Sequence, residues 1–180
     1  MVAAIFHKLA FSGLAATLAA GASLVNSASV EPAPAYGAQA SRIEAQAAAD
    51  HAAYLFNRAD LNNDGALDED EYSVLAIVTA ELARLNGFVA VDVAGGVKTV
   101  ALPHAGRRTL SEADKGRIVS RSLREFSVIA GDDLRLAADE FASAQLEQFF
   151  ASDVDRNGVL AGGELTAFAQ AQSKLAAVSS

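Results

Sequence analysis

The sequence contains no cysteine among its 180 residues. Without cysteine the chain can form no disulfide and no zinc ribbon, and it has neither a thiol nucleophile nor a cysteine for N-terminal lipidation. Sulfur usage therefore says nothing about the redox compartment.

Basic residues are few, with 14 Lys and Arg against 22 Asp and Glu, so the formal net charge is -8. A nucleic-acid-binding surface needs a basic stripe to neutralise phosphates, and the sequence has none. The only local basic group contains His104, Arg107 and Arg108, and we interpret these residues as solvated charges. We expect no nucleic-acid partner.

Sequence motifs of common enzymes are also missing. There is no nucleophile elbow, no zinc-binding motif, no phosphate-binding loop and no histidine paired with a nucleophile. His51 has no second histidine or cysteine near it, so we expect a surface or boundary residue rather than a metal ligand. The sequence therefore predicts a protein that is not an enzyme.

Hydrophobic residues make up 52% of the chain, which is enough to bury the core of one domain of ordinary size. Alanine supplies much of this fraction, and alanine has the highest helix propensity. A mainly α fold is therefore expected.

Residues 60–71, which read DLNNDGALDEDE, place oxygen-bearing side chains at alternate positions. Ca²⁺ is a hard cation that takes six to eight oxygen ligands at about 2.3–2.6 Å, so a tightly curled loop with inward side chains suits it. Gly65, at position six of the twelve, supplies the turn. The predicted ligands are Asp60, Asn62, Asp64, the carbonyl of Ala66, Asp68 (directly or through water) and both carboxylate oxygens of Glu71.

Residues 153–164, which read DVDRNGVLAGGE, repeat this pattern, with Gly158 at position six. The predicted ligands are Asp153, Asp155, Asn157, the carbonyl of Val159 and Glu164. Position nine is Ala161, so a water should replace the Asp68 side chain there. The count of carboxylates predicts that the first loop binds Ca²⁺ more tightly than the second. The alternative is two polar turns that merely cap helices, but glycine, leucine and glutamate recur at positions six, eight and twelve.

On these residues the chain resembles the EF-hand superfamily of calcium-binding proteins, calmodulin and its relatives. The resemblance covers the two loops and the helices beside them, and it implies helix–loop–helix units that hold two Ca²⁺ ions. A third segment copies the spacing from Leu136 to Glu140, but Ile129 and Leu134 stand where the first ligand and the glycine belong. We interpret this third segment as a loop that binds no calcium.

Residues 1–22 have the features of a signal peptide: His7 and Lys8 precede an apolar run, and Ala20-Gly-Ala22 fits a cleavage site. An uncleaved membrane anchor is the alternative, because the apolar run approaches the roughly 20 residues of a spanning helix. With cleavage, the protein is periplasmic or secreted and has no contact with a membrane. Residues 23–40 should form a flexible linker, and residues 41–176 the EF-hand domain.

Helix boundaries follow from capping residues. Ser41 and Glu44 form a possible capping box for a helix that runs to Ala59. The next helix should run over residues 69–86, with Leu82 on its inner face and Gly87 as its C-terminal cap. A third helix should begin after Thr109 or Ser111 and reach about Phe126.

Residues 88–102 change to a period of two and predict a β-hairpin that turns at Gly95 and Gly96. The fold class expected is therefore mainly α, with EF-hand units and an inserted β-hairpin. One face of the hairpin should be buried; it carries Val89, Val91, Val93, Val100 and Leu102. We favour a packing role for this hairpin over a partner-binding edge.

EF-hand loops pair through a short strand at position eight. A single helix over residues 138–152 would hold the third segment and the second calcium loop roughly 20 Å apart, which is too far for pairing. We therefore expect the two calcium loops to pair with each other, with Leu67 beside Leu160.

The predicted function is calcium binding in a periplasmic or secreted protein that acts as a sensor or buffer. Met1 is the only methionine, which argues against a calmodulin-like, methionine-rich groove. The alternative is a structural or interaction module that calcium merely stabilises. A protein partner could bind the hairpin or an apolar groove in either case.

Overall fold

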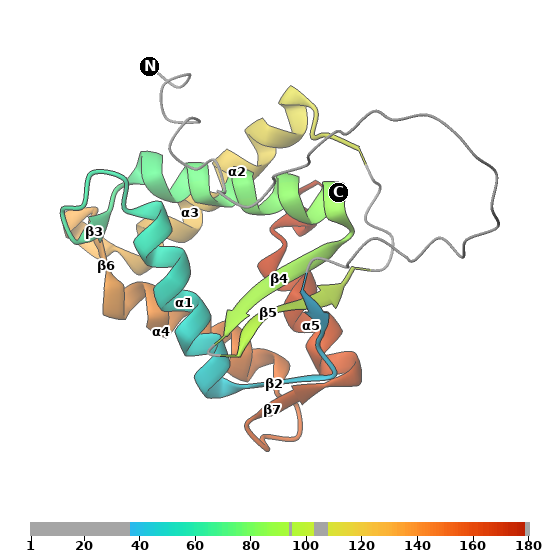
Figure 1. Cartoon of the computed structure of the whole chain (residues 1–180). Helices are drawn as coiled ribbons and strands as arrows, with labels where there is room; N and C mark the ends of the chain where they lie inside the picture. Colours follow the sequence, from blue (N-terminus) through green and yellow to red (C-terminus); the bar gives the residue numbers. More distant parts are fainter. Residues whose placement is uncertain (1–36, 94, 103–107, 179–180) are drawn as a thin grey trace, which may run out of the picture. The chain divides into compact units, whose positions relative to one another are not determined.

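The computed structural model describes residues 37–93, 95–102 and 108–178 (Figure 1). The predicted signal peptide, most of the predicted linker and the basic residues His104 and Arg107 lie outside the described residues. Within the described part, no helix combines the length and the apolar character that a membrane crossing needs.

The described part of the chain is 61% helical and has a mixed α/β fold, because small sheets accompany five α-helices. The helices are α1 (Ala45–Ala59), α2 (Glu69–Asn86), α3 (Glu112–Ile129), α4 (Ala138–Ser152) and α5 (Gly162–Gln172). The strands are β1 (Ala38–Gln39), β2 (Arg42–Glu44), β3 (Ala66–Leu67), β4 (Phe88–Val93), β5 (Gly96–Ala101), β6 (Leu136–Ala137) and β7 (Val159–Ala161). The helical majority agrees with the sequence prediction, and the strands make the fold mixed rather than mainly α.

Helix α1 begins later than its capping signal predicts. Residues 42–44 form β2, and Glu44 occupies the N-cap of α1 without a side-chain cap hydrogen bond. The predicted capping box at Ser41 is therefore wrong. The reason is burial: Ile43 is 3% exposed in β2, and burying an isoleucine outweighs the ~1 kcal/mol of a cap. The preceding strand β1 runs parallel to β5, so regular backbone begins inside the segment predicted as a linker.

Helices α2 and α3 follow their capping signals more closely. Helix α2 has the predicted bounds, with a capping box between Asp68 and Glu71 and with Gly87 in the left-handed conformation at its end. Helix α3 begins after Ser111, whose side chain forms a capping box with Asp114, and runs three residues beyond the predicted end. One inward prediction is wrong, since Leu82 is 37% exposed.

The hairpin of β4 and β5 buries the predicted face, but Gly96, which was predicted to lie in the turn, already belongs to β5 and lies opposite Val93. Val89 lies opposite Val100, and the buried hydrophobic residues are Val89, Val91, Val100 and Leu102, with Val93 partly buried against them. They share a core with Phe149 of α4 and Phe168 of α5. Strand β1 covers the other edge of β5, so the sheet order is β1-β5-β4. These contacts support the packing role for the hairpin.

The pairing of the loops differs from the prediction. Leu67 in β3 lies opposite Leu136 in β6, and Leu160 in β7 lies opposite Ile43 in β2. The expected Leu67–Leu160 neighbourhood is therefore wrong. Helix α4 separates Leu136 from Leu160, as expected. The third segment therefore pairs with β3, and the second calcium loop pairs with β2 (Figure 1). Strand β2 was not predicted from the sequence, because Ser41 and Glu44 were interpreted as the capping box of a helix.

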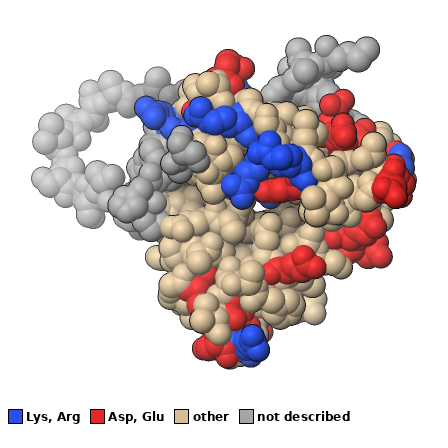
Figure 2. Space-filling model, turned by 180° about the vertical axis from the view of Figure 1, so that it is seen from behind, with Lys and Arg blue, Asp and Glu red and all other residues tan. Residues whose placement is uncertain are grey.

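Charged side chains of α3 form ion pairs mostly with one another and with Lys174, which follows α5. Ion pairs join Lys115 to Glu112, and join both Arg121 and Lys174 to Glu125. Figure 2 shows the back of the molecule, where Lys and Arg side chains gather with Asp and Glu among and around them.

Candidate metal centre

The first position of each acidic loop holds the turn by two backbone N–H groups. In the first loop, Asp60 accepts hydrogen bonds from the N–H of Asp64 at 3.2 Å and of Gly65 at 3.1 Å. In the second loop, Asp153 accepts them from the N–H of Asn157 at 3.1 Å and of Gly158 at 2.9 Å. The two loops therefore curl around their first carboxylate in the same way.

The third and fifth positions also repeat. The Oδ1 atoms of Asn62 and Asp155 each accept from the N–H two residues later, at 2.8 and 3.1 Å. The Oδ1 atoms of Asp64 and Asn157 do the same for Ala66 and Val159, at 3.1 and 2.7 Å. Ala66 and Val159, whose carbonyls are predicted ligands, are the first residues of β3 and β7.

The glutamate at the twelfth position reaches back over each loop. Oε1 of Glu71 accepts from the N–H of Leu61 at 2.9 Å and of Asn62 at 3.3 Å. Oε1 of Glu164 accepts from the N–H of Val154 at 2.9 Å and of Asp155 at 3.3 Å. Each exiting helix is thereby fastened to the beginning of its loop.

Backbone angles give a fourth common feature. The φ angles are positive at the fourth and sixth positions of both loops, with Gly65 at 83° and Gly158 at 77°. In the third segment, Leu134 also has a positive φ, of 54°, two residues before Leu136. Leu134 thus takes the conformation that glycine takes in the other two loops, although leucine enters this region at a steric cost.

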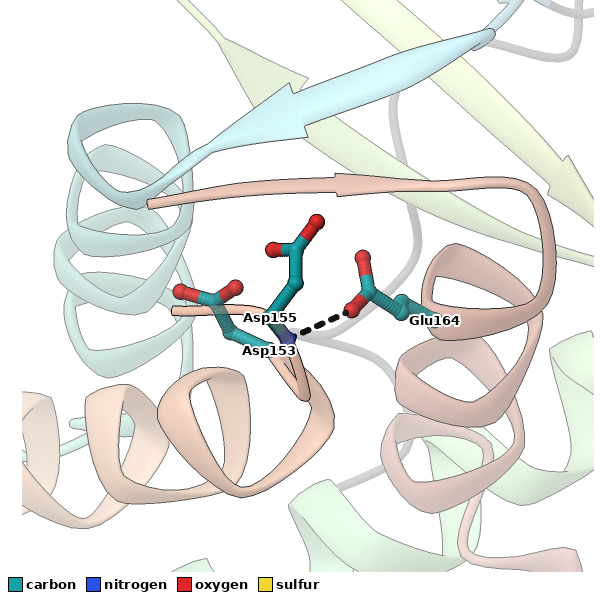
Figure 3. A group of neighbouring side chains, drawn as sticks. All are labelled: Asp153, Asp155 and Glu164. Atoms are coloured by element: carbon teal, nitrogen blue, oxygen red, sulfur yellow. Dashed lines mark hydrogen bonds between the residues drawn. The ribbon is translucent and has the colours of Figure 1, made fainter. Parts of the chain in front are cut away.

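The carboxylates of the second loop converge. Asp153, Asp155 and Glu164 bring ligand oxygens within 4.8 Å of one another, and they are the one such acidic group found in the described part of the chain. Figure 3 shows the three carboxylates around a shared space between the end of α4 and the beginning of α5. Asp153 is buried, Glu164 is half-buried and Asp155 is exposed, so the space remains open to solvent on one side. These three carboxylates could hold a metal ion.

The first loop does not bring its carboxylates together in this way. Oδ2 of Asp64 forms an ion pair with Nη2 of Arg135 at 2.8 Å. The hydrogen bond from Arg135, followed by that from the N–H of Ala66, lowers the pKa of Asp64. Asp68 accepts the N–H of Glu71 at 2.8 Å, as the N-cap of α2. The N–H of Asp68 in turn donates a hydrogen bond to Oε2 of Glu71, at 3.1 Å.

The contacts of two residues, Arg135 and His51, were not anticipated from the sequence. Arg135 was not considered, because the segment around it lacks calcium ligands of its own. Its place directly before Leu136, which matches the eighth position of the calcium loops, could have indicated that it lies near another loop. His51 is 7% exposed rather than a surface or boundary residue, and its Nδ1 accepts from the N–H of Asp92 at 3.0 Å. Burial lowers the pKa of His51 to about 4. This histidine therefore joins α1 to β4 and has no part in the acidic loops.

Comparison of the chain with protein-family models, with curated proteins and with solved structures finds no match.

Proposed function

We propose that the chain binds Ca²⁺ through EF-hand units, with residues 153–164 as the principal site. The observation that carries this proposal is the convergence of Asp153, Asp155 and Glu164. Three carboxylates at this separation repel one another in the absence of a cation, and a divalent cation converts the repulsion into attraction. Ligands made of oxygen alone favour Ca²⁺ or Mg²⁺ over zinc or copper.

The EF-hand assignment is supported by the second acidic loop. Residues 60–71 repeat the spacing, the positive φ angles and the hydrogen bonds of residues 153–164, and two helices flank each loop. Leu67 and Leu160 occupy the eighth position of their loops, and each lies in a short antiparallel pairing. The turn at Leu134 supports a third unit of the same origin that has lost its ligands.

A Ca²⁺ ion fits these loops better than Mg²⁺. Ca²⁺ accepts six to eight oxygens in flexible geometry, whereas Mg²⁺ needs a nearly ideal octahedron and keeps several waters. In the second loop, the oxygens of Asp153, Asp155 and Glu164 can be joined by the Val159 carbonyl and by water at position nine. Asn157 would have to turn its amide, since its Nδ2 now donates to Oδ2 of Asp155 at 2.8 Å.

The contacts favour the second loop as the tighter site. Carboxylate count alone predicts the opposite order, but Asp64 is paired with Arg135 and both Asp68 and Glu71 are occupied as a helix cap. By contrast, α5 has no side-chain cap hydrogen bond at its N-terminus, and of the Glu164 oxygens only Oε1 accepts a hydrogen bond within the described residues. We therefore expect residues 153–164 to fill first.

Two roles for the ion follow from where this loop lies. As a sensor or buffer, the protein would respond to changes in calcium concentration. As a structural module, it would be stabilised by RT ln(1 + [Ca²⁺]/Kd), about 2.7 kcal/mol at a hundredfold excess over Kd. The stabilising role is favoured by Leu160, which is 0% exposed and packs in the same core as the hairpin.

The signal-like residues 1–22 favour a periplasmic or secreted location, where millimolar calcium would suffice. Finding residues 1–22 on a protein retained inside cells would contradict that location.

Calorimetric titration of the protein with Ca²⁺ tests the proposal. We expect two binding events in the wild-type protein, loss of the tighter one in Glu164→Gln and loss of the weaker one in Glu71→Gln. Arg156→Gln, which changes an exposed loop residue that is not a ligand, serves as the control and should keep both events. Absence of any binding heat and of any thermal shift at millimolar Ca²⁺ would refute the proposal.

A further inference from the structure

We infer that Arg135 is an internal counter-ion that competes with Ca²⁺ for Asp64 and thereby sets the low affinity of residues 60–71. The inference rests on the proposed function. Its basis is the ion pair of 2.8 Å between Nη2 of Arg135 and Oδ2 of Asp64, the fifth-position carboxylate of the first loop. The same Oδ2 accepts from Nδ2 of Asn62 at 3.2 Å, and Oδ1 accepts from the N–H of Ala66. Both oxygens of Asp64 are therefore in use.

The fold fixes the place of this arginine. Arg135 directly precedes β6, in which Leu136 lies opposite Leu67, and neither leucine is exposed to solvent. Continuing the antiparallel register by one residue sets Arg135 opposite Asp68. The backbone of Arg135 is thus anchored by the core, while its side chain, 51% exposed, extends across to the loop.

Bound Ca²⁺ and this guanidinium compete for Asp64 in the first loop. An ion that Asp64 ligates would lie within a few ångströms of the positive charge that Arg135 holds against Oδ2. In water, two unit charges 4 Å apart interact by about 1 kcal/mol, and the divalent charge doubles that figure. Because both side chains are half-exposed, screening reduces the effect, and we expect a weakening of about threefold to tenfold in Kd.

The second loop offers a matched comparison within the same chain. Its partner strand carries Arg42 opposite Ala161 at position nine, directly before the buried Ile43, just as Arg135 precedes Leu136. However, position five of this loop is the neutral Asn157, and no ion pair of Arg42 with a carboxylate is found in the described part of the chain. An arginine at the same register therefore meets a carboxylate in one loop and not in the other.

Two calcium affinities in one chain follow from this difference. The second loop would fill first, and the first loop would fill only after Ca²⁺ has displaced Arg135 from Asp64. This second step should depend on salt, because the ion pair is exposed.

The test isolates the first loop. In a full-length Glu164→Gln background, calorimetry with CaCl₂ measures binding to residues 60–71 alone. Adding Arg135→Gln, which keeps a polar side chain of similar length, should tighten Kd about threefold to tenfold at low salt, and the gain should shrink at 0.5 M KCl. Adding Arg42→Gln instead should leave Kd unchanged. Far-ultraviolet circular dichroism establishes that each variant is folded.

The possible failures are distinguishable. If Arg135→Gln leaves Kd unchanged, or if Arg42→Gln tightens it equally, the counter-ion role is overturned while calcium binding stands. If neither the wild-type protein nor any variant binds Ca²⁺, as measured by heat and by thermal shift, the proposed function fails and the inference fails with it.

Discussion

Leu67 and Leu136 lie opposite each other in the pairing of β3 with β6, and both side chains are completely buried. This contact joins the first acidic loop to a segment without ligands, inside a core that also contains Phe56, Phe126 and Phe141. The ligand-free segment is therefore a structural partner of the acidic loop. The packing of Leu136 against Leu67 gives a physical reason for the shape of this segment, including the left-handed conformation of Leu134.

Truncating Leu136 should destabilise the protein strongly. Leu136→Ala removes a fully buried side chain and leaves a cavity, so we expect the free energy of unfolding to fall by about 2–5 kcal/mol. Leu85→Ala, at a position 42% exposed on α2, is the control and should cost less than about 1 kcal/mol. Urea unfolding followed by circular dichroism measures both. Equal losses in the two variants would contradict the described core.

Two glycine-to-alanine substitutions should act in opposite directions. Gly116 lies within α3 and Gly158 has a φ of 77°, and at neither site would an added Cβ meet another atom within 4 Å. Backbone conformation alone therefore decides the outcome. Gly116→Ala should raise the free energy of unfolding by about 0.5–1 kcal/mol, and Gly158→Ala should lower it by about 1–2 kcal/mol. Unfolding in the absence of calcium separates these effects from ion binding, and a stabilised Gly158→Ala protein would disagree with the left-handed turn.

His51 should make stability depend on pH below neutrality. Its Nδ1 accepts the N–H of Asp92, and desolvation by burial lowers its pKa from 6.5 to about 4. The unfolded chain therefore binds a proton at higher pH than the folded protein does. The stabilising contribution is complete above pH 6.5 and is lost as the pH falls from 6.5 towards 4, by on the order of 3 kcal/mol.

The His51→Gln variant provides the comparison for this pH effect. Other groups titrate in both proteins, so the informative quantity is the difference in free energy of unfolding between wild-type protein and variant at each pH. That difference should shrink as the pH falls from 6.5 to 4. Parallel stability curves over this interval would show that His51 is not the group responsible.

The sequence predicted correctly the elements whose ends are marked by capping or turn residues within the same segment. Helix α2 begins at the capping box of Asp68 and Glu71 and ends at Gly87, and each signal is local. The hairpin was also predicted, because alternating valines flank a pair of glycines. By contrast, the signal at Ser41 was overridden by the burial of Ile43, a contact with a residue more than a hundred positions away.

The sequence also predicted the part of the candidate site that depends on residues within one loop. The side chains of Asp153, Asp155 and Glu164 meet as their spacing within one loop predicts. The state of the first loop depends instead on Arg135, which is contributed by another segment through a two-residue pairing. Pairings this short have no periodicity, so the sequence offers no sign of which strand lies beside which.

A crystal structure of the protein grown with CaCl₂, with an anomalous difference map recorded at long wavelength, tests the central claim most directly. We predict a strong peak between Asp153, Asp155 and Glu164, with six to eight oxygens at about 2.3–2.6 Å, and a weaker peak or none in residues 60–71. A well-ordered second loop without a peak at millimolar Ca²⁺ would contradict the account.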